Sequence, residues 1–138
     1  MLTENQFLAI MRIAKKANLK VTGHIPLSMT LFSAIDSGLN GIEHLRNFAL
    51  SIASNSDELY RERIELHKNP DDLPGSDLRS LIHSKQRMKA LDSIDHDKFE
   101  EAANLLALKN VWQTPTLFLY RNSAQKIFKD VSFINELN

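Results

Sequence analysis

Two histidines, His24 and His44, stand where their side chains could bind a metal ion. Each lies near the carboxyl end of a short segment with strand character, at residues 20–25 and 41–45. Because neighbouring parallel strands end at the same edge of a sheet or barrel, groups at these ends converge on one pocket. Two neutral imidazoles in one pocket are suitable ligands for zinc or a similar divalent ion. From spacing alone, the alternative of two hydrogen-bonded or surface histidines stays open.

A helix precedes the first of these strands. Thr3 and Gln6 have the spacing of a capping box, which satisfies amides at a helix start. Asn18 is a residue that readily adopts the left-handed conformation after a helix. The sequence therefore predicts a helix over about 4–17. Its apolar stripe is Phe7, Ile10, Met11, Ala14 and Ala17.

A second helix links the two histidine segments. Pro26 stops the strand at 20–25, Ser28 is expected to cap the helix, and Gly38 to end it. The strand at 41–45 follows. Short strands joined by single helices indicate a parallel sheet, and hence an α/β fold.

Residues 46–110 interrupt this alternation of helices and strands and are predicted to be largely helical. Prolines and a glycine predict a loop at 69–75, and helices are expected after Ser76 and after Asp95. Shorter helices are expected at 47–53 and 57–68, the latter carrying an exposed run of charges.

Residues 111–138 are predicted to form a strand followed by a helix. The strand spans 111–120 and ends or bends at Pro115, which has no backbone N–H to donate. The helix covers about 123–130. We expect one unit of 138 residues: strand–helix units at 1–45, a helical insertion at 46–110, and the final strand and helix.

The motifs around the histidines resemble the middle of the metal-dependent amidohydrolase superfamily. The matching segments are residues 20–26 (KVTGHIP), 34–38 (AIDSG), 41–45 (GIEHL) and 114–117 (TPTL). The resemblance covers roughly residues 5–120 and is closest to the imidazolonepropionase-like and prolidase-like branch. It implies barrel strands five to seven, and so part of a TIM barrel with about three short parallel strands.

The resemblance also implies a chemistry. His24 and His44 correspond to metal-binding histidines of the fifth and sixth strands, with zinc or another divalent metal as the cofactor. Such enzymes hydrolyse C–N bonds in amide, peptide-like or cyclic amide substrates, using a metal-activated water. Gly23 would let the backbone pass close to the site, although a purely structural glycine is an equal alternative.

Several family features are not found in this chain. It has no HxH metal pair, and no strand that matches those carrying the bridging lysine and the catalytic aspartate. We therefore assign no catalytic residue and expect the chain to be inactive alone. The alternative is a non-catalytic helical interaction or scaffold protein. Three strands cannot close a barrel, so self-association through exposed strand edges is expected in either case.

The other polar candidates are weaker. Strand alternation predicts that Glu43 points away from His44, in a structural pairing. His67, His83 and His96 lie in polar helical contexts and are expected to be solvated.

Composition limits the partners. Lys plus Arg and Asp plus Glu each number 17, so the net charge is zero, and neither nucleic acid nor a membrane is expected as a partner. There are no cysteines, which excludes disulfides and thiolate metal sites. No signal-peptide pattern follows Met1, so the default expectation is cytoplasmic.

Overall fold

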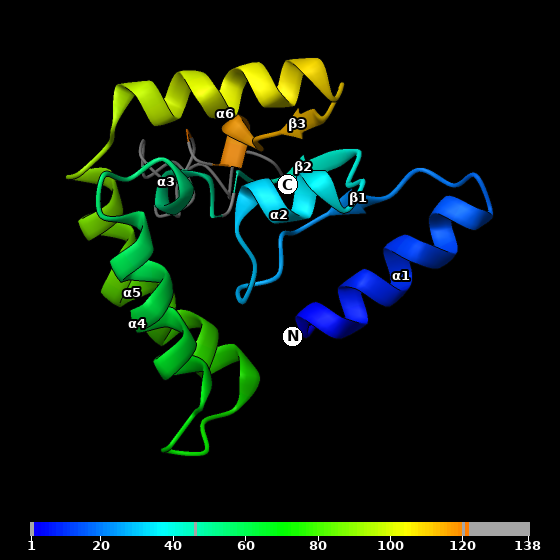
Figure 1. Ribbon diagram of the computed structural model, residues 1–138. Coiled ribbons are helices and arrows are strands. Elements are labelled where there is room, and N and C mark those ends of the chain that lie inside the picture. Colours follow the sequence, from blue (N-terminus) through cyan, green and yellow to red (C-terminus); the bar gives the residue numbers. More distant parts are fainter. Residues whose placement is uncertain (1, 46, 120, 122–138) are drawn as a thin grey trace, which may run out of the picture.

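A small parallel sheet lies at the centre of the molecule. The structure is a computed structural model that describes residues 2–45, 47–119 and 121. Its strands are β1 (Thr22–Gly23), β2 (Gly41–Glu43) and β3 (Trp112–Thr114), in the order β1-β2-β3 (Figure 1). Both pairings are parallel, as predicted. The α/β class is thus confirmed, with the sheet open among the described residues.

The strands are shorter than predicted, for local reasons. Before β1, the Val21 amide donates to the Asn40 side chain at 2.9 Å rather than to a strand neighbour. After β2, His44 and Leu45 have φ values of 61° and 50°, which no strand can continue. Beyond β3, Pro115 has no N–H and Thr116 has a φ of 53°.

The first helix begins where the capping box predicts. Helix α1 (Glu4–Lys16) has both reciprocal hydrogen bonds of the box, and Asn18 follows it with a φ of 53°. Of the predicted stripe, Phe7, Met11 and Ala14 are buried, whereas Ile10 and Ala17 are exposed. The buried face of α1 is therefore narrower than expected.

The second helix begins at a different cap from the one predicted. Helix α2 (Leu31–Asp36) is capped by Thr30, whose hydroxyl accepts from the Ser33 amide at 3.0 Å. Ser28 lies inside the turn that the Met29 amide closes on the Pro26 carbonyl, so it cannot be the cap. Gly38, with a φ of 99°, follows the helix end as expected.

Residues 48–108 are largely helical, as predicted. Helices α3 (Phe48–Ser51), α4 (Ser56–His67), α5 (Gly75–Leu91) and α6 (His96–Leu108) follow one another. Helices α4 and α5 form a hairpin, and α6 runs along the sheet (Figure 1). Asp95 caps α6 as predicted, but α5 begins after Pro74, so Ser76 lies within it and is not its cap.

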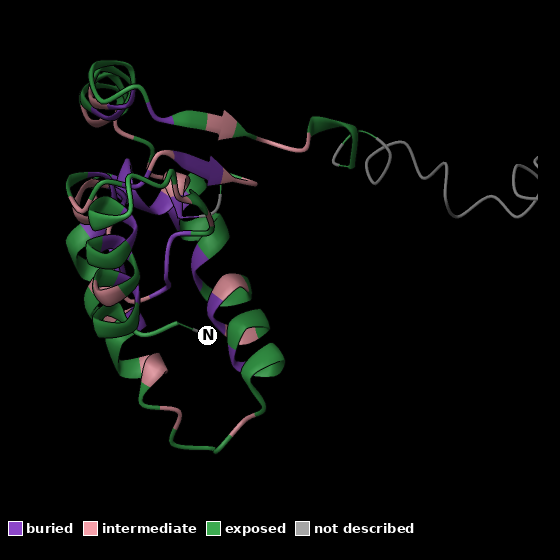
Figure 2. Ribbon diagram, turned by 90° about the vertical axis from the view of Figure 1, so that its right-hand side faces the viewer, coloured by how far each residue is buried: buried purple, intermediate pink, exposed green. Residues whose placement is uncertain are grey.

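The main core lies between the sheet and the helices that cover it. It joins residues of α1, α2, β2 and α6, including Met11, Leu31, Ile42 and Ala102. In Figure 2 the buried residues follow the sheet and the helix faces turned toward it, and the outer faces are exposed. A smaller cluster joins α3, α4 and α5 through Leu50, Leu59 and Ala90.

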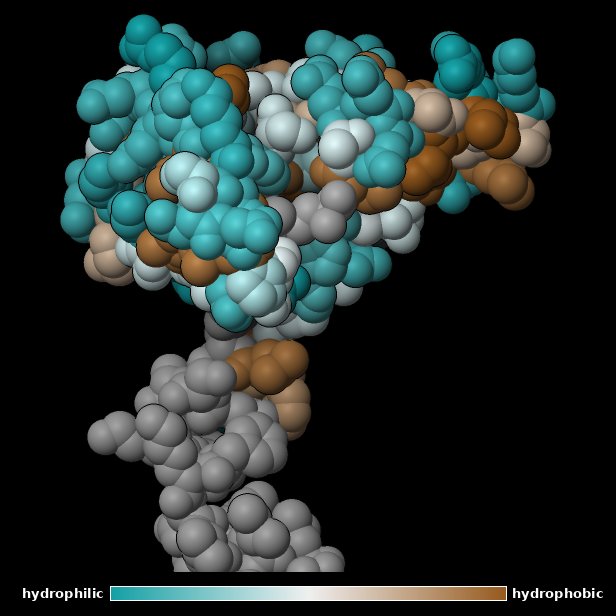
Figure 3. Space-filling view, turned by 90° about the horizontal axis from the view of Figure 1, so that it is seen from below, coloured by the Kyte–Doolittle hydropathy of each residue, from teal (hydrophilic) through white to brown (hydrophobic). Residues whose placement is uncertain are grey.

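The molecule also exposes apolar side chains. Leu8, Ile10 and Ile13 are exposed on α1, and Figure 3 shows apolar surface on the side of the molecule where α1 lies. None of the described helices has the length and apolar character needed to cross a membrane. The helix predicted at 123–130 lies outside the described residues.

Candidate metal centre

Three side chains with metal-binding atoms meet at one end of the sheet. They belong to His24, Glu43 and His44, and the ligand atoms they offer all lie within 4.8 Å of one another. The two imidazole rings have centroids 4.9 Å apart and are tilted by 41°. His24 Nδ1 lies 3.9 Å from Glu43 Oε2. The histidines from the ends of neighbouring strands thus lie side by side, as parallel pairing requires.

Glu43 does not lie where strand alternation predicts. A regular strand would direct Glu43 and His44 to opposite faces. His44 instead has a left-handed backbone, with a φ of 61°, so the alternation ends at Glu43. The carboxylate and the following imidazole therefore both reach the group that contains His24, and the prediction that Glu43 faces away is wrong.

His44 is held by β3 and the residues after it. Its amide donates to the Thr114 carbonyl at 2.8 Å, and its Nδ1 lies 2.9 Å from the Thr116 hydroxyl. Donor and acceptor in the second contact depend on the imidazole tautomer. With Nδ1 engaged by Thr116, Nε2 is the ring atom through which His44 would bind a metal.

The donor set fits a borderline divalent ion such as zinc. Two imidazoles and a carboxylate are a known catalytic zinc ligand set, with metal–ligand distances of about 2.0–2.2 Å. Tetrahedral ligands at that distance are about 3.3 Å apart. The ligand atoms of the three side chains are therefore farther apart than in a zinc-bound site, and rotation of the side chains can close the difference. The side chains of His24 and Glu43 are 47% and 41% exposed, so they have room to rotate.

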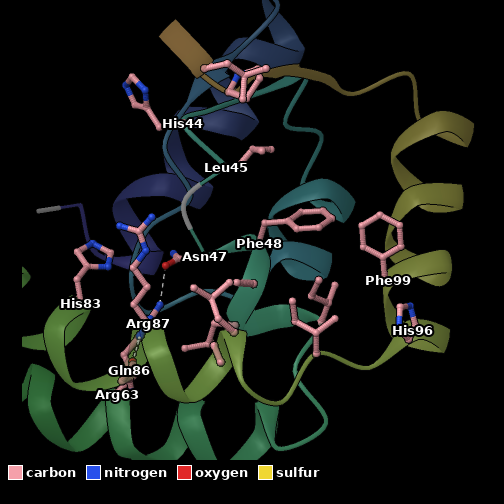
Figure 4. Close-up of a pocket in the computed structure, with 18 residues that line it drawn as sticks. His44, Leu45, Asn47, Phe48, Arg63, His83, Gln86, Arg87, His96 and Phe99 are labelled. Carbon is pink, nitrogen blue, oxygen red and sulfur yellow. Dashed lines mark hydrogen bonds between the residues drawn. The ribbon is translucent and has the colours of Figure 1, made fainter. Parts of the chain in front are cut away.

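A cavity of about 750 Å³ lies beside His44 (Figure 4). Its walls come from α3, α4, α5 and α6 and from the residues after β2 and after β3. They include the aromatic pair Phe48 and Phe99, whose rings meet edge to face at 6.0 Å. Among the described residues, no aspartate or glutamate lines the cavity.

A buried polar network forms part of the cavity wall. Arg63 is only 3% exposed; its Nε donates to Gln86 Oε1 and its Nη1 to Asn47 Oδ1, both at 2.7 Å. Asn47 in turn donates to the Ile25 carbonyl at 3.2 Å, just after His24. Burial lowers the pKa of Arg63 from its ordinary value, but a guanidinium stays protonated at neutral pH. The network therefore places a positive charge inside the protein.

Arg63 belongs to the run of charges that was predicted to be exposed on the helix at 57–68, and that prediction is wrong for this residue. The signal was present, because Ser56, Leu59 and Arg63 are spaced i, i+3 and i+7 and form the buried stripe of α4. A long arginine on an apolar stripe is buried by the same packing that buries its neighbours.

The remaining histidines differ in their surroundings. His96, at the start of α6, is exposed as predicted. His67 and His83 are half-buried rather than solvated, and both His83 and His96 line the cavity. Burial, and next the charge of Arg63, lower the pKa of His67. None of these three histidines belongs to the His24 group.

Comparison of the chain with protein-family models, with curated proteins and with solved structures gave no significant match in any of the three.

Proposed function

We propose that the chain is part of a metal-dependent hydrolase that acts on C–N bonds of amide, peptide-like or cyclic amide substrates. The observation that carries this proposal is the meeting of His24, Glu43 and His44 at the ends of two neighbouring parallel strands. The family motifs at residues 20–26 and 41–45 point to the same two histidines. The three parallel strands would then correspond to strands five to seven of a TIM barrel.

In this proposal His24 and His44 hold a divalent metal, with zinc as the first choice, and Glu43 is a third ligand. A bound zinc ion supplies a water of lowered pKa and polarises the substrate carbonyl. Thr116 orients the His44 ring, and the half-exposed His24 and Glu43 close the ligand set by rotation. The substrate would occupy the neighbouring cavity, which His44 itself lines.

The chain alone is proposed to be inactive. The family's HxH pair is absent from the sequence, and the group of His24, Glu43 and His44 contains neither a lysine nor an aspartate. Self-association is part of the proposal, because neither outer edge of the sheet is paired among the described residues. Size measurement in solution tests this point, and a monomer at high protein concentration would contradict it.

The first test is zinc binding by calorimetry. Wild-type protein should bind one ion, and His24→Ala and His44→Ala should each abolish measurable binding. His96→Ala is the matched control, since it removes an exposed histidine outside the group and should bind as wild type does. No binding by wild type would reject the metal site and leave the non-catalytic helical scaffold as the better reading.

A further inference from the structure

The cavity beside His44 has one basic side and one apolar side. Arg63, His83 and Arg87 contribute from α4 and α5, and Phe48 and Phe99 from α3 and α6. In Figure 4, His83 and Arg87 project from α5 on one side, while Phe48 and Phe99 face each other on the other side. The two arginines therefore lie on one side of the cavity, and the two phenylalanines lie on the other side together with His96.

Within the described part of the chain, the positive charge of Arg63 has no carboxylate partner, and its guanidinium carbon lies 5.8 Å from the centroid of the Tyr60 ring. The ion pairs among the described residues involve neither Arg63 nor Arg87. Arg63 donates through Nε and Nη1 to neutral amide oxygens, and no described residue accepts from its Nη2. Buried charges in proteins are usually paired, because removing an ion from water is costly. An anion in the cavity would supply the missing partner.

The apolar side of the cavity is also partly exposed to solvent. Phe99 is 44% exposed although its ring already contacts Phe48, and the cavity wall around them is formed by leucine, isoleucine and proline side chains. A ligand with an aromatic or branched apolar group would cover this surface, at about 25 cal/mol for each Å² removed from water.

We propose that this cavity binds a small molecule with an apolar group and a carboxylate, such as an N-acylated aromatic amino acid. The carboxylate lies at the guanidinium groups of Arg63 and Arg87, and the apolar group packs against Phe48 and Phe99. As a statement of substrate class this inference rests on the proposed function. It places the amide of such a molecule in the cavity that His44 lines. Binding of the carboxylate itself requires no metal.

The test is a calorimetric titration of the whole chain with N-acetylphenylalanine, in buffer with EDTA. The neutral primary amide of the same compound is titrated in parallel. The acid should bind, and the amide should bind about tenfold more weakly or not at all, since a charged hydrogen bond contributes about one factor of ten or more. Equal binding of acid and amide, or no binding of the acid, would overturn the proposal.

Two pairs of variants locate the ligand. Arg87→Gln should weaken binding of the acid about tenfold, whereas Arg79→Gln, at an exposed position on the same helix, should not. Phe99→Ala should weaken it as well, whereas Leu108→Ala, at an 80% exposed position on α6, should not. Equal losses within either pair would show that binding is not in this cavity.

Because the buffer contains EDTA, binding of the acid in this experiment does not depend on zinc. The result of this experiment and that of the zinc titration are therefore independent. Binding of the acid without zinc binding would retain the cavity assignment and reject the hydrolase. Zinc binding without binding of the acid would retain the metal centre and reject this substrate class.

Discussion

The ring of His44 and the hydroxyl of Thr116 lie 2.9 Å apart, although 72 residues separate them in the sequence. The contact links the end of β2 to the turn that follows β3. Thr116 adopts a φ of 53°, an unusual backbone for a β-branched residue, and this conformation is held by its surroundings. Such a contact is the kind that orients a metal-binding histidine.

Replacing Thr116 should weaken zinc binding without removing it. Thr116→Val keeps the β-branched shape and loses the hydroxyl, so His44 is no longer held through Nδ1. Loss of such an orienting partner typically costs 10–100-fold in metal affinity, and we expect a value near tenfold. Calorimetry against Thr114→Val checks this, because Thr114 accepts from the His44 amide through its backbone carbonyl, which the substitution retains. Equal affinities of the two variants would argue against an orienting role.

Glu43 is expected to act as a ligand through its charge. Glu43→Gln preserves size and removes the carboxylate, so zinc affinity should fall about tenfold or more, since a charged contact is worth at least 1.4 kcal/mol. Glu58→Gln makes the same change at an exposed position of α4 and should have no effect. If Glu43→Gln binds zinc as wild type does, the metal is held by the histidines alone.

Gly41 keeps β1 and β2 close enough for their histidines to meet. A Cβ at this position would lie 2.8 Å from Thr22 Cγ2 and 3.2 Å from Thr22 Cβ. The second atom is close to the backbone, so the strand would have to shift. Gly41→Ala should therefore lower the free energy of unfolding by about 1–3 kcal/mol in urea denaturation.

The control for that variant is Gly75→Ala. A Cβ at Gly75 meets no atom within 4 Å, so this change should leave stability the same or raise it slightly. A Gly41→Ala protein as stable as Gly75→Ala would show that the strands tolerate the wider spacing.

His67 should make stability depend on pH. Burial first, and then the charge of Arg63, lower the pKa of His67 in the folded protein. The unfolded chain therefore binds the proton at a higher pH than the folded protein does, and unfolding takes up protons. Well above the ordinary pKa of 6.5, His67 is neutral in both states and does not change the free energy of unfolding. As the pH drops below that value, the free energy of unfolding falls.

The check is the free energy of unfolding at pH 7.5 and 5.5. His67→Gln should lose less stability between these two conditions than wild type, while the exposed His96→Gln should follow wild type. A His67→Gln protein with the wild-type pH dependence would assign that dependence to other groups.

Helix ends that are set by residues close to one another in the sequence were predictable. The start of α1 follows from Thr3 and Gln6, which bond each other's amides within one turn. The start of α6 follows in the same way from Asp95, which accepts from the amides of Asp97 and Lys98. The prediction that Ser28 caps α2 was wrong, because Ser28 lies within the turn that begins at Pro26 and Thr30 caps the helix instead.

The sequence by itself determined the α/β pattern and the placing of His24 and His44 near the carboxyl ends of two strands, because periodicity and caps act over a few residues. Only the tertiary structure decided that Glu43 joins them, since the left-handed backbone of His44 is set by contacts with residues 114 and 116. It also decided the hydrogen-bond partners of Arg63, which lie on α5 and after β2, although the spacing along α4 already indicated that Arg63 is buried. Contacts between distant segments form only when the chain packs, and no local pattern records them.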